Sequence, residues 1–280
     1  MQQLQINRNE FEKNRENFKK GIQIRNKTRY EELKNADTSI KAAVNLAYND
    51  AKRTLTGIGK HSDKKDRALQ CITKKLKDYF YKGKAPLTEE EFDKVHNELC
   101  QLWCKEFKSL EDGKLGTYGK AQKIVNMSFK YLYCREDAEN YRDYFKYCHM
   151  PLDSFTLEWF KREQFGKNKP DKKIISWSNL ENGENGADTF TDDGKECYSY
   201  HFYKEKIREI ADRNDISPLE LEFIVWPQIQ MELAAEGFLF GLEDDLTKER
   251  KNKIQAKSLE KKYKEIVQIL ESKTRMPPAE

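Results

Sequence analysis

The sequence predicts a mainly α-helical protein, a multi-helix orthogonal bundle of about eight to ten helices. Apolar residues recur at helical spacing along most of the chain, and only 13 Gly and 7 Pro interrupt its 280 residues. Only 37% of the residues are apolar, but 15 Phe, 14 Tyr and 4 Trp supply the large side chains that a core needs. Aromatic residues in such number, placed in periodic segments, argue against a chain that is disordered throughout.

Three parts are expected along the chain. Residues 1–35 form a charged helical arm, residues 36–240 a helical core domain, and residues 241–280 a basic C-terminal helix. An irregular insertion near 165–197 is rich in Gly, Asn and Asp. Its short apolar run, residues 174–177, has room for one short strand, and the insertion as a whole has room for a short hairpin.

Helix starts in the core domain are marked by capping residues. Thr88 opens a Thr-x-x-Glu capping box. Ser217 and Pro218 combine a cap with a proline at the first helical position, and Pro227 should kink or end the helix that they begin. Asp153 opens a further helix directly after a Pro-Leu pair.

Charge and targeting signals narrow the class of protein. The net charge of +4, from 52 basic and 48 acidic residues, permits a nucleic-acid partner without demanding one. No apolar run is long enough to span a bilayer, and the N-terminus lacks the apolar core of a signal peptide. We therefore expect a cytoplasmic protein without membrane contact, whose 6 cysteines are reduced.

The stretch Met150-Pro151-Leu152-Asp153 is the first candidate for chemistry. Proline ends the preceding helix, and backbone N–H groups at the next helix start can hold a carboxylate. Asp153 has two interpretations. It is a plain helix cap, for which Asp is a preferred residue, or it carries out chemistry on a nucleic acid.

Two glycine-containing turns are candidates for phosphate binding. In Leu-Thr-Gly-Ile-Gly-Lys, the amides of Gly57 and Gly59 would face a phosphate, and Gly119 lies in the looser Leu-Gly-Thr-Tyr-Gly-Lys. The helix after the second turn carries Lys120 and Lys123, whose amines would be nucleophiles if burial lowered their pKa. These lysines could equally line a solvated face.

Residues 115–160 resemble the helix-hairpin-helix DNA glycosylases. The gap of 30 residues between Lys123 and Asp153 is longer than the family's usual step from hairpin to aspartate, and in this respect the chain is most similar to the archaeal 8-oxoguanine glycosylase branch. The resemblance implies that Asp153 is the catalytic carboxylate, that Lys123 or Lys120 is the amine nucleophile, and that a nucleotide is flipped out of the duplex. His149 and Tyr131 would line the base pocket.

The chain departs from the family pattern in three respects. The turn before Lys120 lacks the Gly-x-Gly spacing, and the Gly57 turn lies too far upstream of Asp153 to be the same hairpin. There is no four-cysteine iron–sulfur loop, so no cofactor is expected.

Other clusters are weaker candidates. His96, Cys100 and Cys104 fall on one helical stripe and are residue types that zinc prefers, but ligands spaced along a straight helix converge poorly. Core packing is the favoured interpretation, and no metal site is predicted. Glu220, Glu222 and Glu232 are expected to be solvated.

The predicted helix at residues 244–272 carries many lysines around a narrow apolar seam. It could follow a nucleic-acid backbone, pair with a protein partner or a second copy as a homodimer, or pack on its own domain. Two functional hypotheses therefore remain open. One is a DNA-directed protein of the glycosylase/lyase type, and the other is a non-enzymatic helical interaction protein of a phage or host-defence system.

Overall fold

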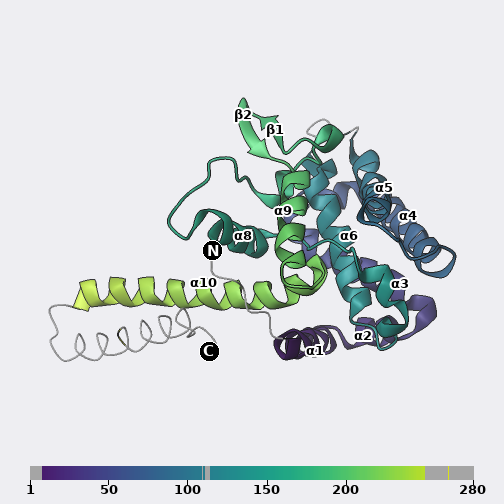
Figure 1. The fold of residues 1–280 in the computed structure, drawn as a ribbon, viewed down its shortest axis with the longest axis horizontal. Coiled ribbons are helices and arrows are strands. Elements are labelled where there is room, and N and C mark those ends of the chain that lie inside the picture. Colours follow the sequence, from purple (N-terminus) through teal and green to yellow (C-terminus); the bar gives the residue numbers. More distant parts are fainter. Residues whose placement is uncertain (1–7, 109, 111–113, 250–263, 265–280) are drawn as a thin grey trace. The chain divides into compact units, whose positions relative to one another are not determined.

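The mainly α fold is confirmed. The computed structural model describes residues 8–108, 110, 114–249 and 264, with backbone alone over 238–249. The described residues form ten α-helices and one two-stranded sheet (Figure 1). The α-helices are α1 Arg8–Arg25, α2 Lys27–Lys34, α3 Ala36–Ala51, α4 Ser62–Tyr81, α5 Glu89–Phe107, α6 Tyr118–Tyr133, α7 Arg142–Phe145, α8 Ser154–Phe165, α9 Tyr200–Asp212 and α10 Pro218–Glu249. Short 3-10 helices connect them: η1 Lys52–Thr54, η2 Ile58–His61, η3 Lys114–Gly116, η4 Ala138–Tyr141, η5 Trp177–Asn179 and η6 Glu184–Gly186.

The backbone separates into two compact units, Met1–Val225 and Trp226–Glu280, and the division falls within α10. The helix continues through Pro227, where the sequence predicted a kink or an end. Of the charged helix predicted at residues 244–272, residues 244–249 belong to α10, and nearly all of the rest lies outside the described residues.

The N-terminal arm is helical from Arg8 onward and contributes to the core. Phe11, Ile22 and Leu33 are buried, and α2 packs against both α1 and α3. The ring of Phe11 meets that of Phe223 edge-on at a centroid distance of 5.8 Å. The arm therefore belongs to the same packed unit as the core helices.

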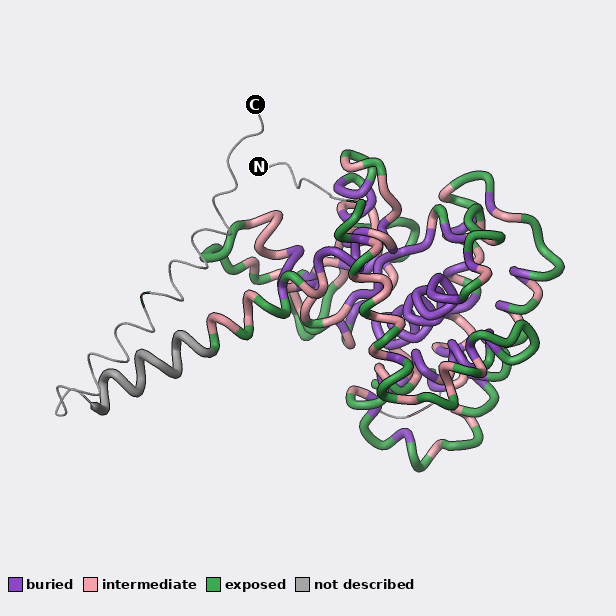
Figure 2. Tube along the Cα trace, turned by 90° about the horizontal axis from the view of Figure 1, so that it is seen from below, coloured by how far each residue is buried: buried purple, intermediate pink, exposed green. Residues whose placement is uncertain are grey.

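Helix α6 is the centre of the first unit. All of its residues are buried, and α3, α5 and η5 pack against it (Figures 1 and 2). A helix that is buried on every side is normally apolar, yet this one carries buried polar side chains at Lys120, Gln122, Lys123, Asn126 and Lys130. Burying such groups costs free energy unless each has a hydrogen-bond or ion-pair partner, so each of these side chains is expected to have one.

The caps predicted from sequence begin the helices as expected. Thr88 accepts a hydrogen bond from the Glu91 amide at 3.3 Å at the start of α5. Ser217 and Glu220 bond each other reciprocally, with the Ser217 amide 2.9 Å from the Glu220 carboxylate and the Glu220 amide 3.2 Å from the Ser217 hydroxyl. In both caps the hydrogen-bonded residues are three positions apart, so the sequence displays the pairing directly.

The strand predicted at residues 174–177 is wrong. Trp177 begins the 3-10 helix η5 instead, and a hairpin lies later in the insertion, between β1 Thr189–Asp192 and β2 Lys195–Tyr198. Its two-residue loop is Asp193–Gly194, with φ of 47° and 73°. Asp-Gly with both φ values positive is the preferred chemistry of a type I′ turn, which fixes the hairpin at this position.

Candidate active site

Lys123 and Asp153 form an ion pair inside the first unit. The Lys123 Nζ lies 2.7 Å from the Asp153 Oδ2. The two side chains are 7% and 14% exposed, so the pair is largely withdrawn from solvent. Helix α6 positions the amine, and the start of α8 positions the carboxylate. Two residues that are 30 positions apart in sequence are thus brought into contact.

Asp153 is also the cap of α8. Its Oδ1 accepts hydrogen bonds from the amides of Phe155, at 2.9 Å, and Thr156, at 3.0 Å. The hydroxyl of Thr156 in turn accepts from the Asp153 amide at 2.8 Å, which completes a capping box. The cap and the ion pair use different oxygens. The capping bonds orient the carboxylate, so that Oδ2 faces Lys123.

Two amide side chains of α6 hold the segment that precedes Asp153. The Gln122 Nε2 donates to the Leu152 carbonyl at 2.9 Å, and its Oε1 accepts from the Leu152 amide at 3.1 Å. One turn later, the Asn126 Nδ2 donates to the Met150 carbonyl at 3.1 Å. The sequence analysis did not identify Gln122 or Asn126 as site residues. The one available signal was the position of Gln122 directly before the candidate Lys123.

Helix α6 forms a second buried ion pair. Lys130 on α6 pairs with Glu222 on α10, and the Glu222 side chain is only 1% exposed. The expectation that Glu222 is solvated is therefore wrong, because its helix face packs into the core. Burial raises the pKa of Glu222, while the charges of Lys130 and Lys123 act in the opposite direction. The Lys130 Nζ also lies 4.3 Å from the centre of the Phe18 ring.

His149 belongs to a polar network on the other side of the Met150–Asp153 segment. Its Nε2 is 2.8 Å from the Asp93 Oδ1, and its Nδ1 is 3.0 Å from the Tyr200 hydroxyl. Burial lowers the pKa of His149 to about 4, so the ring is neutral near pH 7. Burial acts to raise the pKa of Asp93, but bonds from His149 and Lys204 and the charge of Arg208 hold it well below its usual range.

The remaining predicted site residues lie in several places. Tyr131 is buried and donates to the Asp50 Oδ2 at 2.7 Å, which ties α6 to α3. The Lys120 ammonium donates to the carbonyl of Lys114. The Gly119 amide donates to the Leu180 carbonyl at 2.8 Å, so that hydrogen-bond donor is already used.

Gly57 and Gly59 occupy the turn between α3 and α4. Gly57 has a φ of 85°, in the left-handed region, and both residues are exposed. A Cβ built at either position would meet nothing within 4 Å. The backbone of this turn is therefore open to a ligand.

The stripe of His96, Cys100 and Cys104 lies largely in the core, as core packing predicts. His96 and Cys100 are buried, with the Cys100 Sγ 3.8 Å from the His96 Nε2. Across the described residues, no group of three or more His, Cys, Asp or Glu side chains is arranged to hold a metal ion.

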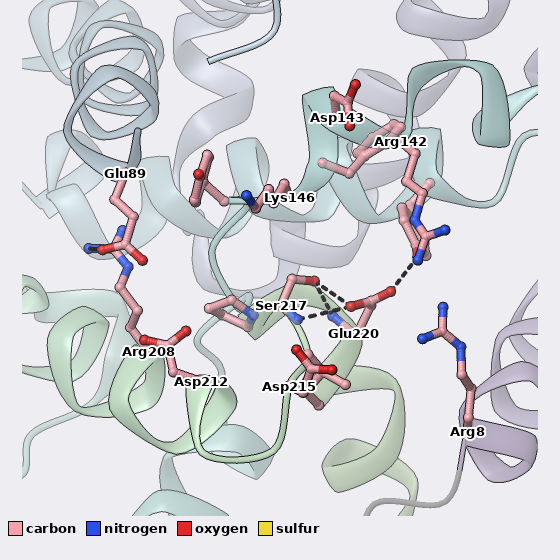
Figure 3. A pocket seen from close by; sticks show the side chains of 15 residues that line it. Arg8, Glu89, Arg142, Asp143, Lys146, Arg208, Asp212, Asp215, Ser217 and Glu220 are labelled. Carbon is pink, nitrogen blue, oxygen red and sulfur yellow. Dashed lines mark hydrogen bonds and ion pairs between the residues drawn. The ribbon is translucent and has the colours of Figure 1, made fainter. Parts of the chain in front are cut away.

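A cavity of about 370 Å³ lies beside the start of α10 (Figure 3). Ser217 and Glu220 form its floor, where Glu220 also accepts from the Tyr133 hydroxyl at 2.8 Å. Both acidic and basic residues line the cavity, and neither Lys123 nor Asp153 is among them. This lining shows no preference for a ligand of one charge.

Comparison with known proteins adds no relative: no family model, no curated protein and no solved structure matches the chain. Within the part of the chain that the structure describes, no helix has both the length and the apolar character needed to cross a membrane.

Proposed function

We propose that this protein acts on DNA as a base-excision enzyme of the helix-hairpin-helix glycosylase type, with Lys123 as nucleophile and Asp153 as the stabilising carboxylate. The observation that carries the proposal is the 2.7 Å contact between Lys123 Nζ and Asp153 Oδ2. A glycosylase of this type needs an amine and a carboxylate at one sugar carbon, and the two side chains meet at a largely buried position.

The chemistry would run on a nucleotide flipped out of the duplex. As the bond from C1′ to the base breaks, the base leaves with the bonding electrons, and the Asp153 carboxylate stabilises the positive charge that develops on the sugar. Lys123 gives up one proton, which the departing base takes, and its neutral amine forms a bond to C1′. Opening of the C1′–O4′ bond, with transfer of a second proton from nitrogen to O4′, leaves an iminium between Lys123 and the sugar.

The contacts of the neighbouring lysines support Lys123 as the nucleophile. Lys130 is paired with the buried carboxylate of Glu222, and Lys120 is bonded to the carbonyl of Lys114. Lys123 is the lysine of α6 that contacts Asp153. Its position on a buried helix also fixes the direction of attack better than a loop would.

The Gly57 turn supports a DNA partner. Its two exposed glycines leave the turn accessible, as a phosphate contact requires, and the exposed Lys60 follows directly within η2. Such contacts fix the position of a duplex without reading its sequence.

The test is fluorescence anisotropy with labelled duplex, single-stranded and abasic-analogue DNA over a salt series. We expect tightest binding to the abasic analogue, and an affinity that falls steeply with salt concentration. Base release is then measured for Asp153→Asn, with Lys120→Gln, on the same helix as Lys123, as the control. Asp153→Asn should bind DNA but release no base, whereas Lys120→Gln should retain activity. Absence of DNA binding at low salt would overturn the proposal and favour a protein-interaction role.

A further inference from the structure

A second cavity, of about 260 Å³, lies between α5, the start of α6, residues 182–186 and α9. We infer that it is a binding site for a nucleobase, carried by a free base or nucleoside or by an unpaired nucleotide of DNA. Neither Lys123 nor Asp153 is among its lining residues. The inference rests on the lining of this cavity and does not depend on the proposed function.

The floor of the cavity is aromatic. His96, His149 and Tyr200 line it, and they are 1%, 3% and 2% exposed. The rings of His96 and Tyr200 are parallel within 6°, with centroids 5.5 Å apart, and Tyr118 adds a fourth ring, 5.1 Å from Tyr200. Burial lowers the pKa of both imidazoles, so the floor is uncharged near pH 7. These rings pack on one another, so a planar heterocycle would lie against the edges of the cluster.

The rim supplies amide groups. Asn97, Asn182 and Asn185 line the opening, and each amide carries both a donor and an acceptor. The bond between Asn182 and Asn97 is long, at 3.4 Å, so these amides are weakly engaged with one another. Asn side chains bond two adjacent atoms of an adenine edge at once, which makes this rim suited to a base.

The loop that presents these amides has an unusual backbone. Gly183, Asn185 and Gly186 have φ of 90°, 50° and 80°. A Cβ at Gly183 would lie 2.3 Å from the Ala187 carbonyl oxygen, so this position requires glycine. Asn is among the few residues other than glycine that adopt a positive φ readily, and here that conformation holds the Asn185 amide at the rim.

Size and charge favour a neutral ligand with one ring system. The volume is somewhat below the roughly 300 Å³ at which pockets for drug-sized ligands begin. Among the lining residues, the carboxylate of Asp93 is paired with Lys204, and Lys94 adds one further positive charge at the exposed edge. The lining therefore offers no strong binding site for a phosphate chain, and a base or nucleoside fits it better than a nucleotide triphosphate.

Isothermal titration calorimetry on the full chain tests this inference with adenine, adenosine, guanosine, cytidine and thymidine, and with ribose as the control ligand. At least one base-containing ligand should bind, and ribose should not. Asn97→Ala and Asn185→Gly should each weaken that binding by roughly tenfold, about the effect of one lost hydrogen-bonding group. Asn185→Gly keeps the positive φ, so it removes the amide without straining the loop. Asn140→Ala, an exposed change outside the lining, should leave the affinity unchanged.

A competition experiment separates the two sources of the base. If a duplex with an unpaired adenine displaces adenosine, and Asn97→Ala weakens both, the base is presented by DNA. If the duplex does not compete, the ligand is a free base or nucleoside. The inference is overturned if no base-containing ligand binds, or if binding survives both Asn variants. It is equally overturned if Lys123→Gln abolishes the binding, because the ligand would then occupy the Lys123–Asp153 pair.

Discussion

Gln122 binds Leu152 through both of that residue's backbone groups, donating to its carbonyl at 2.9 Å and accepting from its amide at 3.1 Å. The Gln122 side chain thus forms the two hydrogen bonds that a neighbouring β-strand would otherwise form with Leu152. Because Leu152 directly precedes Asp153, helix α6 determines where the carboxylate lies. Lys123 is the next residue of the same helix, so one helical turn fixes both members of the pair.

Gln122→Ala should destabilise the protein and impair its site together. Loss of the amide leaves two buried backbone groups without partners, which costs on the order of 1–3 kcal/mol for each buried group left unsatisfied. We expect the free energy of unfolding, measured with urea, to fall by roughly 2–4 kcal/mol. Gln70→Ala, an exposed change on α4, is the control and should alter it by less than about 0.5 kcal/mol. Equal effects of the two variants would contradict the role given to Gln122.

The buried pair of Lys130 and Glu222 predicts a non-additive pair of mutations. Lys130→Met alone leaves a buried carboxylate without its cation, and Glu222→Leu alone leaves a buried ammonium. Each single variant should lose about 3–5 kcal/mol of unfolding free energy. The double variant should lose much less than the sum, since apolar groups of similar volume can replace such a pair at little cost. Additive losses in a double-mutant cycle would show that the two charges are not coupled.

Gly119 and Gly59 form a matched test of backbone packing. A Cβ at Gly119 would lie 1.9 Å from the Trp177 carbonyl oxygen, whereas one at Gly59 would meet nothing within 4 Å. Gly119→Ala must push residues 177–180 away from α6, and we expect a loss of about 1–3 kcal/mol. Gly59→Ala should be neutral or slightly stabilising. Thermal unfolding of both variants decides this, and a neutral Gly119→Ala would contradict the observed close approach.

Stability should fall as the pH drops from about 6.5 to 4. The pKa of His149 is lowered by burial to about 4 in the folded state, so the unfolded chain binds the proton first. The stability linked to this group is therefore complete above its unfolded pKa of about 6.5 and is lost as the pH approaches 4, by about 3 kcal/mol in all. His96, whose pKa is also lowered by burial, acts in the same direction.

The variant His149→Gln measures how much His149 contributes to the pH dependence of the free energy of unfolding. Carboxylates away from this ring contribute equally to both proteins, so the difference between the two urea-unfolding profiles reports His149 together with its bonded partner Asp93. The variant should show a shallower decline of unfolding free energy between pH 6.5 and 4. Parallel profiles for the variant and the unmodified protein would contradict a buried, neutral His149.

Sequence reasoning succeeded where the signal and the structure are both local. Thr88, Asp153 and Ser217 cap helices because their side chains bond amides two or three residues ahead, a distance that the sequence displays directly. A short hairpin was expected in the insertion, but its position was not predicted, although Asp193–Gly194 is a strong turn signal.

Long-range relationships could not be read in the same way. Nothing in the spacing of Lys123 and Asp153 requires them to touch, since that contact depends on how α6 packs against the residues before α8. The burial of Glu222 is similar, because only the packing of α10 distinguishes it from a solvated carboxylate. Gln122 and Asn126 carry donors and acceptors that suit any exposed helix, and their role appears only when their backbone partners are known.

Trapping with sodium borohydride tests the central claim most directly. The full chain is incubated with duplexes that carry an abasic site or a damaged base, reduced, and digested, and the modified peptide is identified by mass spectrometry. The account predicts a covalent adduct on Lys123, lost in Lys123→Gln and retained in Lys120→Gln. An adduct on a different lysine, or no adduct with any of these duplexes despite tight DNA binding, would contradict the assignment of Lys123 as the nucleophile.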